Sequence, residues 1–228
     1  MIRKGFSLPK IRKHIEEYKK FITSDEYDEI YKWKALNTFQ KNWDLEAKDF
    51  KKMYENSLKK SSNLVSSSFW YPKDVMLKFI DYDEVRVRKM FKDLFDENVD
   101  VEKRAETFVY HCDMLRDEIA KTDTSIKNHF HDGHRMISLY LAFRYPEKYA
   151  IYKYTEFKKF MQLVDATDIP TTKETKRFYK IVKTIYNILK NDDELLEIHK
   201  NLLDDECYKG ETLMLAQDFI FCSARRYM

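Results

Sequence analysis

Apolar residues recur three and four positions apart through most of this chain, which is the spacing of one face of an α-helix. Three such stripes are the clearest, and they run over residues 87–95, 101–119 and 178–189. Only 3 Gly and 4 Pro interrupt the 228 residues, which favours helices joined by short loops. The pattern predicts an all-α fold: a single compact multi-helix domain of about eight to ten helices, with little or no sheet.

The helical pattern divides the chain into three parts. A basic N-terminal helix is expected within residues 1–22, and a main helical unit within residues 23–165. Residues 166–228 are expected to form a C-terminal helical group that packs on the main unit. The boundary is placed at the polar segment 165–173, which contains Pro170 and has the composition of a connecting loop.

Capping residues predict individual helix ends. Thr23 or Ser24, and then Asp44, are placed to cap helices, because their side chains accept hydrogen bonds from the free N–H groups of a first turn. The Ser-rich segment 59–68 predicts a loop. Pro72 suits the first turn of the next helix, where its missing N–H costs little.

Composition and charge narrow the class of protein. Charged residues make up 36% and hydrophobic residues 43% of the chain, a balance that supports a packed core. The formal net charge of +3 neither requires nor excludes a polyanionic partner. Cys112, Cys207 and Cys222 form no CxxC pair, so we expect a cytoplasmic protein rather than a disulfide framework. No apolar run approaches the ~20 residues that cross a bilayer, so no membrane partner is expected.

The most distinctive stretch, residues 128–160, interleaves five Tyr with Arg and Lys. Aromatic rings alternating with positive charge suit a surface that stacks on bases and holds phosphates. The candidate nucleic-acid-binding residues are Arg144, Lys148, Tyr149, Tyr152, Lys153, Tyr154, Lys158 and Lys159. Core packing explains the same rings more simply, because Tyr is often buried with its hydroxyl at a polar group. Residue chemistry alone therefore favours packing.

Phosphate-loop and hydrolase motifs are absent. Gly5, Gly133 and Gly210 are too far apart for GxxxxGK[ST], GxGxxG or GxSxG, and neither HExxH nor a paired CxxC occurs. No catalytic residue and no cofactor is assigned, and the chain is expected not to be an enzyme.

A short His cluster raises a metal hypothesis. His129, His131 and His134 lie close together, with Asp132 between them, and imidazole suits zinc and similar ions. Their spacing on a Gly-containing loop does not aim three rings at one point. A surface His cluster is the simpler interpretation, so no metal site is assigned.

Arg104 and His111 raise a ribonuclease hypothesis. They lie seven residues apart on one expected helix, and two helical turns place them on one face. Arg could hold a scissile phosphate while His transfers a proton. The pair loosely resembles the Arg-to-His motif of HEPN-type helical ribonucleases, although Ala105 replaces the usual polar residue. Chance occurrence is the better explanation.

Several segments resemble the region that precedes the AAA+ GTPase motor in McrB-like, modification-dependent restriction proteins. They are WKALNTFQKNWD at residues 33–44, NLV at 63–65, YPK at 71–73, VRKMFKDLFDE at 87–97, ISLYLAFRYPEKYAIYKY at 137–154 and QDFIF at 217–221. The resemblance covers about residues 28–222, and the RYPEKYAIYKY segment is its most specific part.

The resemblance implies a non-catalytic target-recognition module of an anti-phage restriction system. Its partners would be DNA, with or without a modified base, and an AAA+ GTPase motor and nuclease subunit. GTP hydrolysis and DNA cleavage are not assigned, because the motor motifs lie outside these residues. Two alternatives remain: a protein-interaction adaptor that docks on the motor or nuclease, and the helical ribonuclease with Arg104 and His111.

Overall fold

The prediction of an all-α fold is confirmed. The computed structural model describes residues 5–65, 67 and 69–226, and this part of the chain forms eleven helices and no strand beyond one isolated bridge between Ser67 and Trp70. The helices are α1 (Leu8–Ile22), α2 (Tyr31–Asn42), α3 (Phe50–Ser57), α4 (Ser62–Val65), α5 (Pro72–Leu94), α6 (Val101–Ile119), α7 (His134–Arg144), α8 (Tyr154–Leu163), α9 (Thr175–Leu189), α10 (Asp193–Leu202) and α11 (Met214–Arg225).

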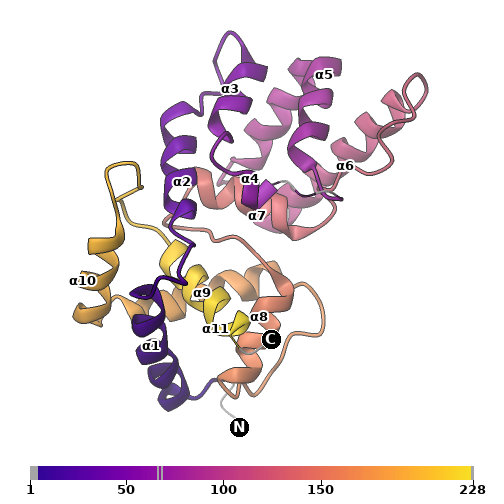
Figure 1. Cartoon of the computed structure of the whole chain (residues 1–228). Helices are drawn as coiled ribbons and strands as arrows, with labels where there is room; N and C mark the ends of the chain where they lie inside the picture. The colour runs from indigo at the N-terminus through magenta and orange to yellow at the C-terminus, as the bar shows by residue number, and fades with distance from the viewer. Residues whose placement is uncertain (1–4, 66, 68, 227–228) are drawn as a thin grey trace.

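The helices form two neighbouring groups (Figure 1). Helices α2 to α7 make the upper group, in which α5 packs along α6 and α3 packs against α2 and α5. Helices α1 and α8 to α11 make the lower group, in which α11 packs against α8, α9 and α1. Helix α8 therefore lies with the C-terminal helices. The division at residues 22 and 165 stays a prediction about which parts fold independently.

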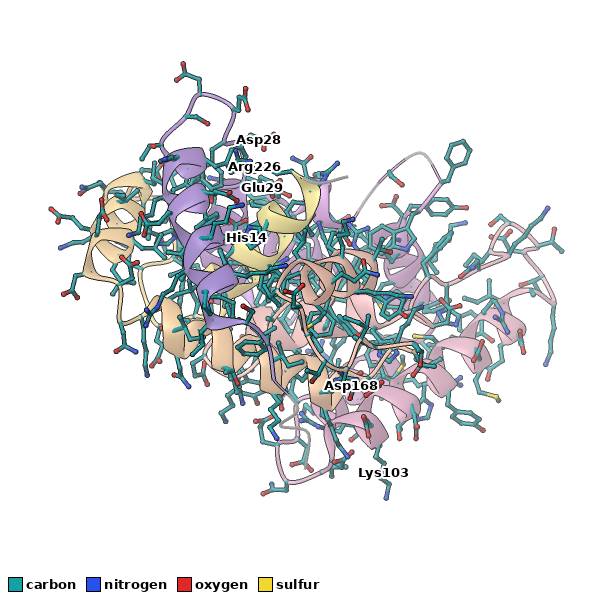
Figure 2. All side chains as sticks on the ribbon, turned by 90° about the horizontal axis from the view of Figure 1, so that it is seen from below. His14, Asp28, Glu29, Lys103, Asp168 and Arg226 are labelled. Carbon is teal, nitrogen blue, oxygen red and sulfur yellow. The ribbon has the colours of Figure 1, made fainter. Side chains whose placement is uncertain are left out.

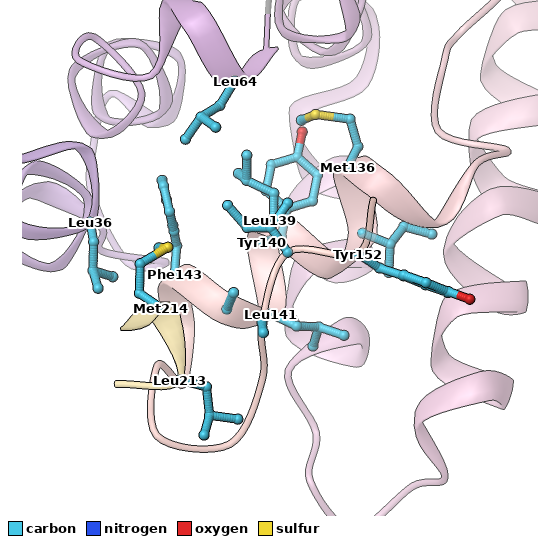
Figure 3. Close-up of a cluster of buried hydrophobic side chains, with 14 of the residues drawn as sticks. Leu36, Leu64, Met136, Leu139, Tyr140, Leu141, Phe143, Tyr152, Leu213 and Met214 are labelled. Carbon is cyan, nitrogen blue, oxygen red and sulfur yellow. The ribbon is translucent and has the colours of Figure 1, made fainter. Parts of the chain in front are cut away.

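Helix α7 joins the two groups. Every residue from Met136 to Phe143 is buried, so this helix has no solvent-facing stripe along its middle. Figure 3 shows Leu64 of the upper group on one side of α7 and Leu213 of the lower group on the other. Burial on all sides identifies α7 as the centre of one continuous core.

Local sequence signals explain several of the helix starts. Ser7 and Asp192 cap α1 and α10 through their side chains, and Pro72 occupies the first turn of α5 as expected. Asp44 does not cap a helix. It accepts a hydrogen bond from the Glu46 N–H in a turn, and Asp49 caps α3 instead.

Three further helix boundaries differ from expectation. The helix expected after Ser24 begins only at Tyr31. The short helix α4 lies within the segment 59–68, which was expected to be a loop. Helix α5 continues through a kink at Asp83, whose φ of −151° and ψ of 80° are not helical. Asp83 then accepts the Arg86 N–H as an internal cap (2.9 Å), which explains how the helix restarts.

The C-terminal end of the described chain lies against α1. Figure 2 shows His14 of α1 and Arg226 beyond α11 at one side of the molecule, with Lys103 of α6 at the far side. Arg226 donates to the Glu17 carbonyl oxygen at 3.0 Å. Among the described helices, each is too short or too polar to cross a membrane.

Candidate functional site

The Tyr-rich stretch lies mostly inside the protein. Tyr140 and Tyr152 expose 0% and 2% of their surface, and Figure 3 shows both rings within the core around α7. The Tyr152 ring stacks on Phe178 of α9, with centroids 4.2 Å apart and planes 15° apart. A role for Tyr152 in base stacking would therefore require this packing to open.

Two other predicted rings are half-buried and held by hydrogen bonds. The Tyr149 hydroxyl donates to Glu97 Oε1 at 2.7 Å and accepts from Arg104 Nη2 at 2.8 Å. The Tyr154 hydroxyl donates to the Pro170 carbonyl oxygen at 3.2 Å. These rings fix the segment against α6 and the loop before α9, which is a structural use of both hydroxyls.

The predicted cations have different environments. The Arg144 guanidinium and the Lys148 ammonium both lie beside the Tyr145 ring, at 5.1 and 5.2 Å from its centroid. Lys148 also pairs with Glu97 at 3.1 Å. Lys158 and Lys159 are half-buried on α8. Arg144 is exposed and remains the best placed of the group for a phosphate.

Lys153 is directed into the protein. Its ammonium lies 3.8 Å from the centroid of the Phe221 ring, and Lys32 lies 4.2 Å from the same ring. Burial, followed by the positive charges of Lys32 and Arg135, lowers the pKa of Lys153 to about 8. Within the described residues, Lys153 forms no ion pair with a carboxylate. It is thus an uncompensated, partly buried cation.

Lys32, in contrast, is fully compensated. Its ammonium pairs with Asp218 at 2.6 Å and Glu29 at 2.8 Å, and both Lys32 and Asp218 have 0% exposed side chains. Tyr18 and Tyr27 donate to the second Asp218 oxygen at 2.6 and 2.9 Å. Burial alone would raise the pKa of Asp218, but Lys32 and the two hydroxyls hold it below its usual range. This network joins α1, α2 and α11.

The surroundings of Lys153 are electropositive. Arg135 stacks on Trp70, with its guanidinium carbon 4.2 Å from the ring centroid, and donates to the Leu64 carbonyl oxygen at 3.0 Å. A cavity of about 10 Å³ adjoins Lys153 and Gln217, and Gln217 Oε1 is buried without a hydrogen-bond partner in the described part of the chain. That space suits one water molecule rather than a ligand.

The His cluster is divided between two places. Within the described residues, one ligand atom each of Cys112, His129 and His131 lies within 4.8 Å of the others, and all three side chains are buried. His134 lies apart, with Nδ1 2.9 Å from the Thr175 hydroxyl oxygen. Cys112 was not part of the hypothesis from sequence, because it is brought in by tertiary packing from α6.

Hydrogen bonds occupy the ring nitrogens of both clustered His. His131 Nδ1 donates to the His129 carbonyl oxygen at 2.5 Å, which leaves Nε2 to accept from the Tyr140 hydroxyl at 3.1 Å. His129 Nδ1 accepts the His131 N–H at 3.0 Å, and its Nε2 lies 3.2 Å from Asp113 Oδ1. Burial lowers the pKa of both imidazoles, that of His131 to about 3. The rings could offer neutral nitrogens to a metal only by breaking these bonds.

Arg104 has a structural environment. It exposes 4% of its surface, donates to the Leu94 carbonyl oxygen at 2.8 Å, and pairs with Glu97 at 3.0 Å. His111 is half-buried, and its ring contacts Tyr110. The guanidinium of Arg104 is therefore already bound and is not presented to a phosphate at the surface.

An exposed basic face on α9 was missed from the sequence. No Asp or Glu occurs between Thr175 and Leu189, and four Lys fall within about 80° around the helix axis, opposite the buried face. These are Lys176, Lys180, Lys183 and Lys190, all of them exposed. Lys176 pairs with Asp100 and Glu102 at 2.9 and 3.0 Å. In the described part of the chain, Lys180, Lys183 and Lys190 form no ion pair.

Comparisons with protein-family models, curated proteins and solved structures found no match to this chain.

Proposed function

We propose that this chain is a non-catalytic nucleic-acid-binding module that uses the basic face of α9. The observation that carries the proposal is the row of Lys180, Lys183 and Lys190, exposed and without internal partners in the described structure. Ten residues of helix place the outer two about 15 Å apart. That length spans a few successive phosphates of one DNA strand.

The proposal places the module in a cytoplasmic restriction system of the McrB-like type. Its support is the resemblance of residues 28–222, above all RYPEKYAIYKY at residues 144–154. In that setting, DNA is the bound polyanion, and an AAA+ GTPase motor with its nuclease is the partner that acts on the DNA. Phosphate contact by Lys holds a module on a duplex without reading its sequence.

The experiment is a fluorescence-anisotropy titration with plain and methylated duplex DNA, single-stranded DNA and RNA at about 50 and 200 mM salt. The test variant is Lys180→Ala/Lys183→Ala/Lys190→Ala. We expect its affinity to fall at least about tenfold at low salt, and the slope of log K against log salt to become shallower by about two to three.

The matched control is Lys52→Ala/Lys121→Ala/Lys127→Ala, which removes three exposed Lys elsewhere on the surface and changes the net charge equally. Equal losses in the two variants would mean diffuse attraction and reject the α9 site. A third variant, Arg144→Ala/Lys148→Ala/Lys158→Ala/Lys159→Ala, tests the surface expected from the sequence. If this variant alone loses binding, the predicted stretch is the interface and α9 is not.

A protein-interaction adaptor is the second candidate. The observation in its favour is that most exposed large apolar side chains belong to the upper group. These are Phe69, Tyr71, Tyr82, Val85, Tyr110 and Met114, with 90%, 39%, 50%, 81%, 59% and 40% of their surfaces exposed. A partner that covered such residues would gain from their burial. The same titration separates the candidates, because an adaptor shows no salt-dependent affinity for any of the nucleic acids.

A further inference from the structure

A separate cavity lies between α2 of the upper group and helices of the lower group, and none of the four Lys of the basic face of α9 lines it. It has a volume of about 380 Å³ and is bordered by α2, α9, α10 and the segment that leads into α11. Four aromatic side chains line it: Trp33, Tyr186, His199 and Tyr208. Its volume and mixed aromatic and polar lining are in the range of small-molecule sites.

His199 is the unusual group in this cavity. It exposes 8% of its surface, and its Nε2 is buried without a hydrogen-bond partner in the described part of the chain. Its ring lies against Trp33, with centroids 4.7 Å apart. Burial lowers the pKa of His199 to about 4, so the imidazole is neutral near pH 7. An unpaired buried nitrogen costs folding free energy, and a bound ligand with a polar edge would remove that cost.

The wall of the cavity is built in advance. The Tyr208 N–H donates to the Trp33 carbonyl oxygen at 3.1 Å, and Asn37 Nδ2 donates to the Glu206 carbonyl oxygen at 2.7 Å. The Tyr208 ring lies over Gly210, where a Cβ would come within 2.6 Å of the Tyr208 hydroxyl oxygen. Gly at this position lets the ring close over the backbone. The wall is therefore largely formed before a ligand binds, and the His199 side chain is the part that must turn to present its Nε2.

Two Lys side chains line the cavity. Lys209 is paired with Asp205 at 2.9 Å, whereas Lys200 is exposed and forms no ion pair within the described residues. Aromatic walls with a neutral polar nitrogen suit a planar heteroaromatic ring, and a free ammonium suits an attached anionic group.

We propose that this cavity binds a free nucleoside monophosphate. The base lies against the rings of Tyr186 and Tyr208, and a turn of the His199 side chain brings its buried Nε2 to a polar edge of the base. Lys200 holds the phosphate. The inference does not rest on nucleic-acid binding by α9, since the two sites share no residue.

The test is calorimetric titration of the full chain with AMP, GMP, CMP and UMP and with the four corresponding nucleosides. We expect saturable binding of at least one nucleotide. His199→Leu should weaken that binding at least about tenfold, because the hydrogen bond to the base is lost, while the thermal midpoint stays equal or rises. Lys200→Met should weaken nucleotide binding about tenfold but leave nucleoside binding unchanged. The control is Lys121→Met, which alters an exposed Lys outside the lining of the cavity. It should change neither nucleotide binding nor nucleoside binding.

Three results would overturn the proposal. The first is the absence of saturable binding for all eight compounds. The second is binding that survives both His199→Leu and Lys200→Met, which would place the nucleotide elsewhere. The third is loss of binding in the Lys180/Lys183/Lys190 variant described above, which would make the nucleotide a fragment of the polyanion site. If His199→Leu fails to fold, Lys200→Met decides the matter, because it alters an exposed side chain.

Discussion

Two Lys-rich segments of this protein, residues 144–159 and helix α9, use their charges in opposite ways. In the first, Lys148 pairs with Glu97 and Lys153 lies over the Phe221 ring. In the second, Lys183 and its neighbours project from a helix that has no acidic residue. In the first segment, the Tyr rings and the cations Lys148 and Lys153 are engaged within the protein. In the second, Lys176 pairs with Asp100 and Glu102, whereas Lys180, Lys183 and Lys190 form no ion pair among the described residues.

The difference shows which sequence signal marks an accessible cation. Interleaved Tyr and Lys at residues 144–159 satisfy one another and nearby groups, since Tyr offers both a ring face and a hydroxyl. A helix with Lys on one face and apolar residues on the other cannot pair its cations within the helix when, as in α9, it contains no acid. A Lys of this protein is therefore available to a ligand when it lacks an acidic partner, whether or not aromatic residues lie nearby.

The largest effect that separates the segments is on stability. Tyr152→Ala should lower the free energy of unfolding by about 3–5 kcal/mol, because it removes a buried ring stacked on Phe178. Tyr152→Phe should be neutral or slightly stabilising, since the Tyr152 hydroxyl is buried without a partner among the described residues. Urea denaturation measures both changes. A stable Tyr152→Ala variant with weakened nucleic-acid affinity would instead identify Tyr152 as a surface ring.

The next largest expected effect is a loss of stability in acid. Burial lowers the pKa of His131 to about 3 and that of His199 to about 4. Below the usual His pKa of about 6.5, the unfolded chain binds protons that the folded chain does not, so stability falls as the pH drops. Two such groups give a slope of up to about 2.7 kcal/mol per pH unit. Thermal unfolding between pH 7 and 4 measures it.

The His199→Leu variant measures how much His199 contributes to this pH dependence of stability. It should remove up to about 1.4 kcal/mol per pH unit from the slope between pH 6.5 and 4, whereas Lys183→Ala on α9 should leave the slope unchanged. Equal slopes in the wild type and His199→Leu would mean that His199 gains its proton while the protein is still folded.

Lys153→Met should stabilise the protein by about 1–2 kcal/mol near pH 7, after allowance for the partial exposure of the side chain. The pKa of Lys153 is about 8 in the folded state and about 10.4 in an unfolded chain. The folded state therefore disfavours the charged amine. This penalty is complete below pH 8 and disappears as the pH rises above 10.4. Denaturation should show the full gain at pH 7 and a much smaller gain at pH 10. A destabilised Lys153→Met variant would mean that the cation has a compensating partner.

Local patterns were enough to predict the helices but not the sites. The stripe at residues 101–119 predicted α6 because burial on a helix repeats within a few residues. The burial of Tyr152 depends on Phe178, and the approach of Cys112 to His131 depends on the packing of α6. In both contacts the two residues are far apart in the sequence, so no local pattern predicts them.

Two other features were readable from the sequence. The acid-free Lys row of α9 follows from spacing alone. Asp44 and Asp49 are both residues of a type that caps helices. In the structure, Asp44 accepts the Glu46 N–H in a turn, and Asp49 caps α3. The cavity beside His199 needed four segments to meet, so no local signal could reveal it.

The smallest effect compares single charges on the two segments. Lys183→Ala should reduce the slope of log K against log salt by about one for duplex DNA, because one phosphate contact and its released counterion are lost. Lys148→Ala should leave the slope near its original value, since the Lys148 ammonium already pairs with Glu97. Anisotropy titrations over several salt concentrations measure both slopes. If the two slopes fall equally, Lys148 leaves Glu97 to reach the phosphate, and internal pairing does not decide which Lys of this protein can bind DNA.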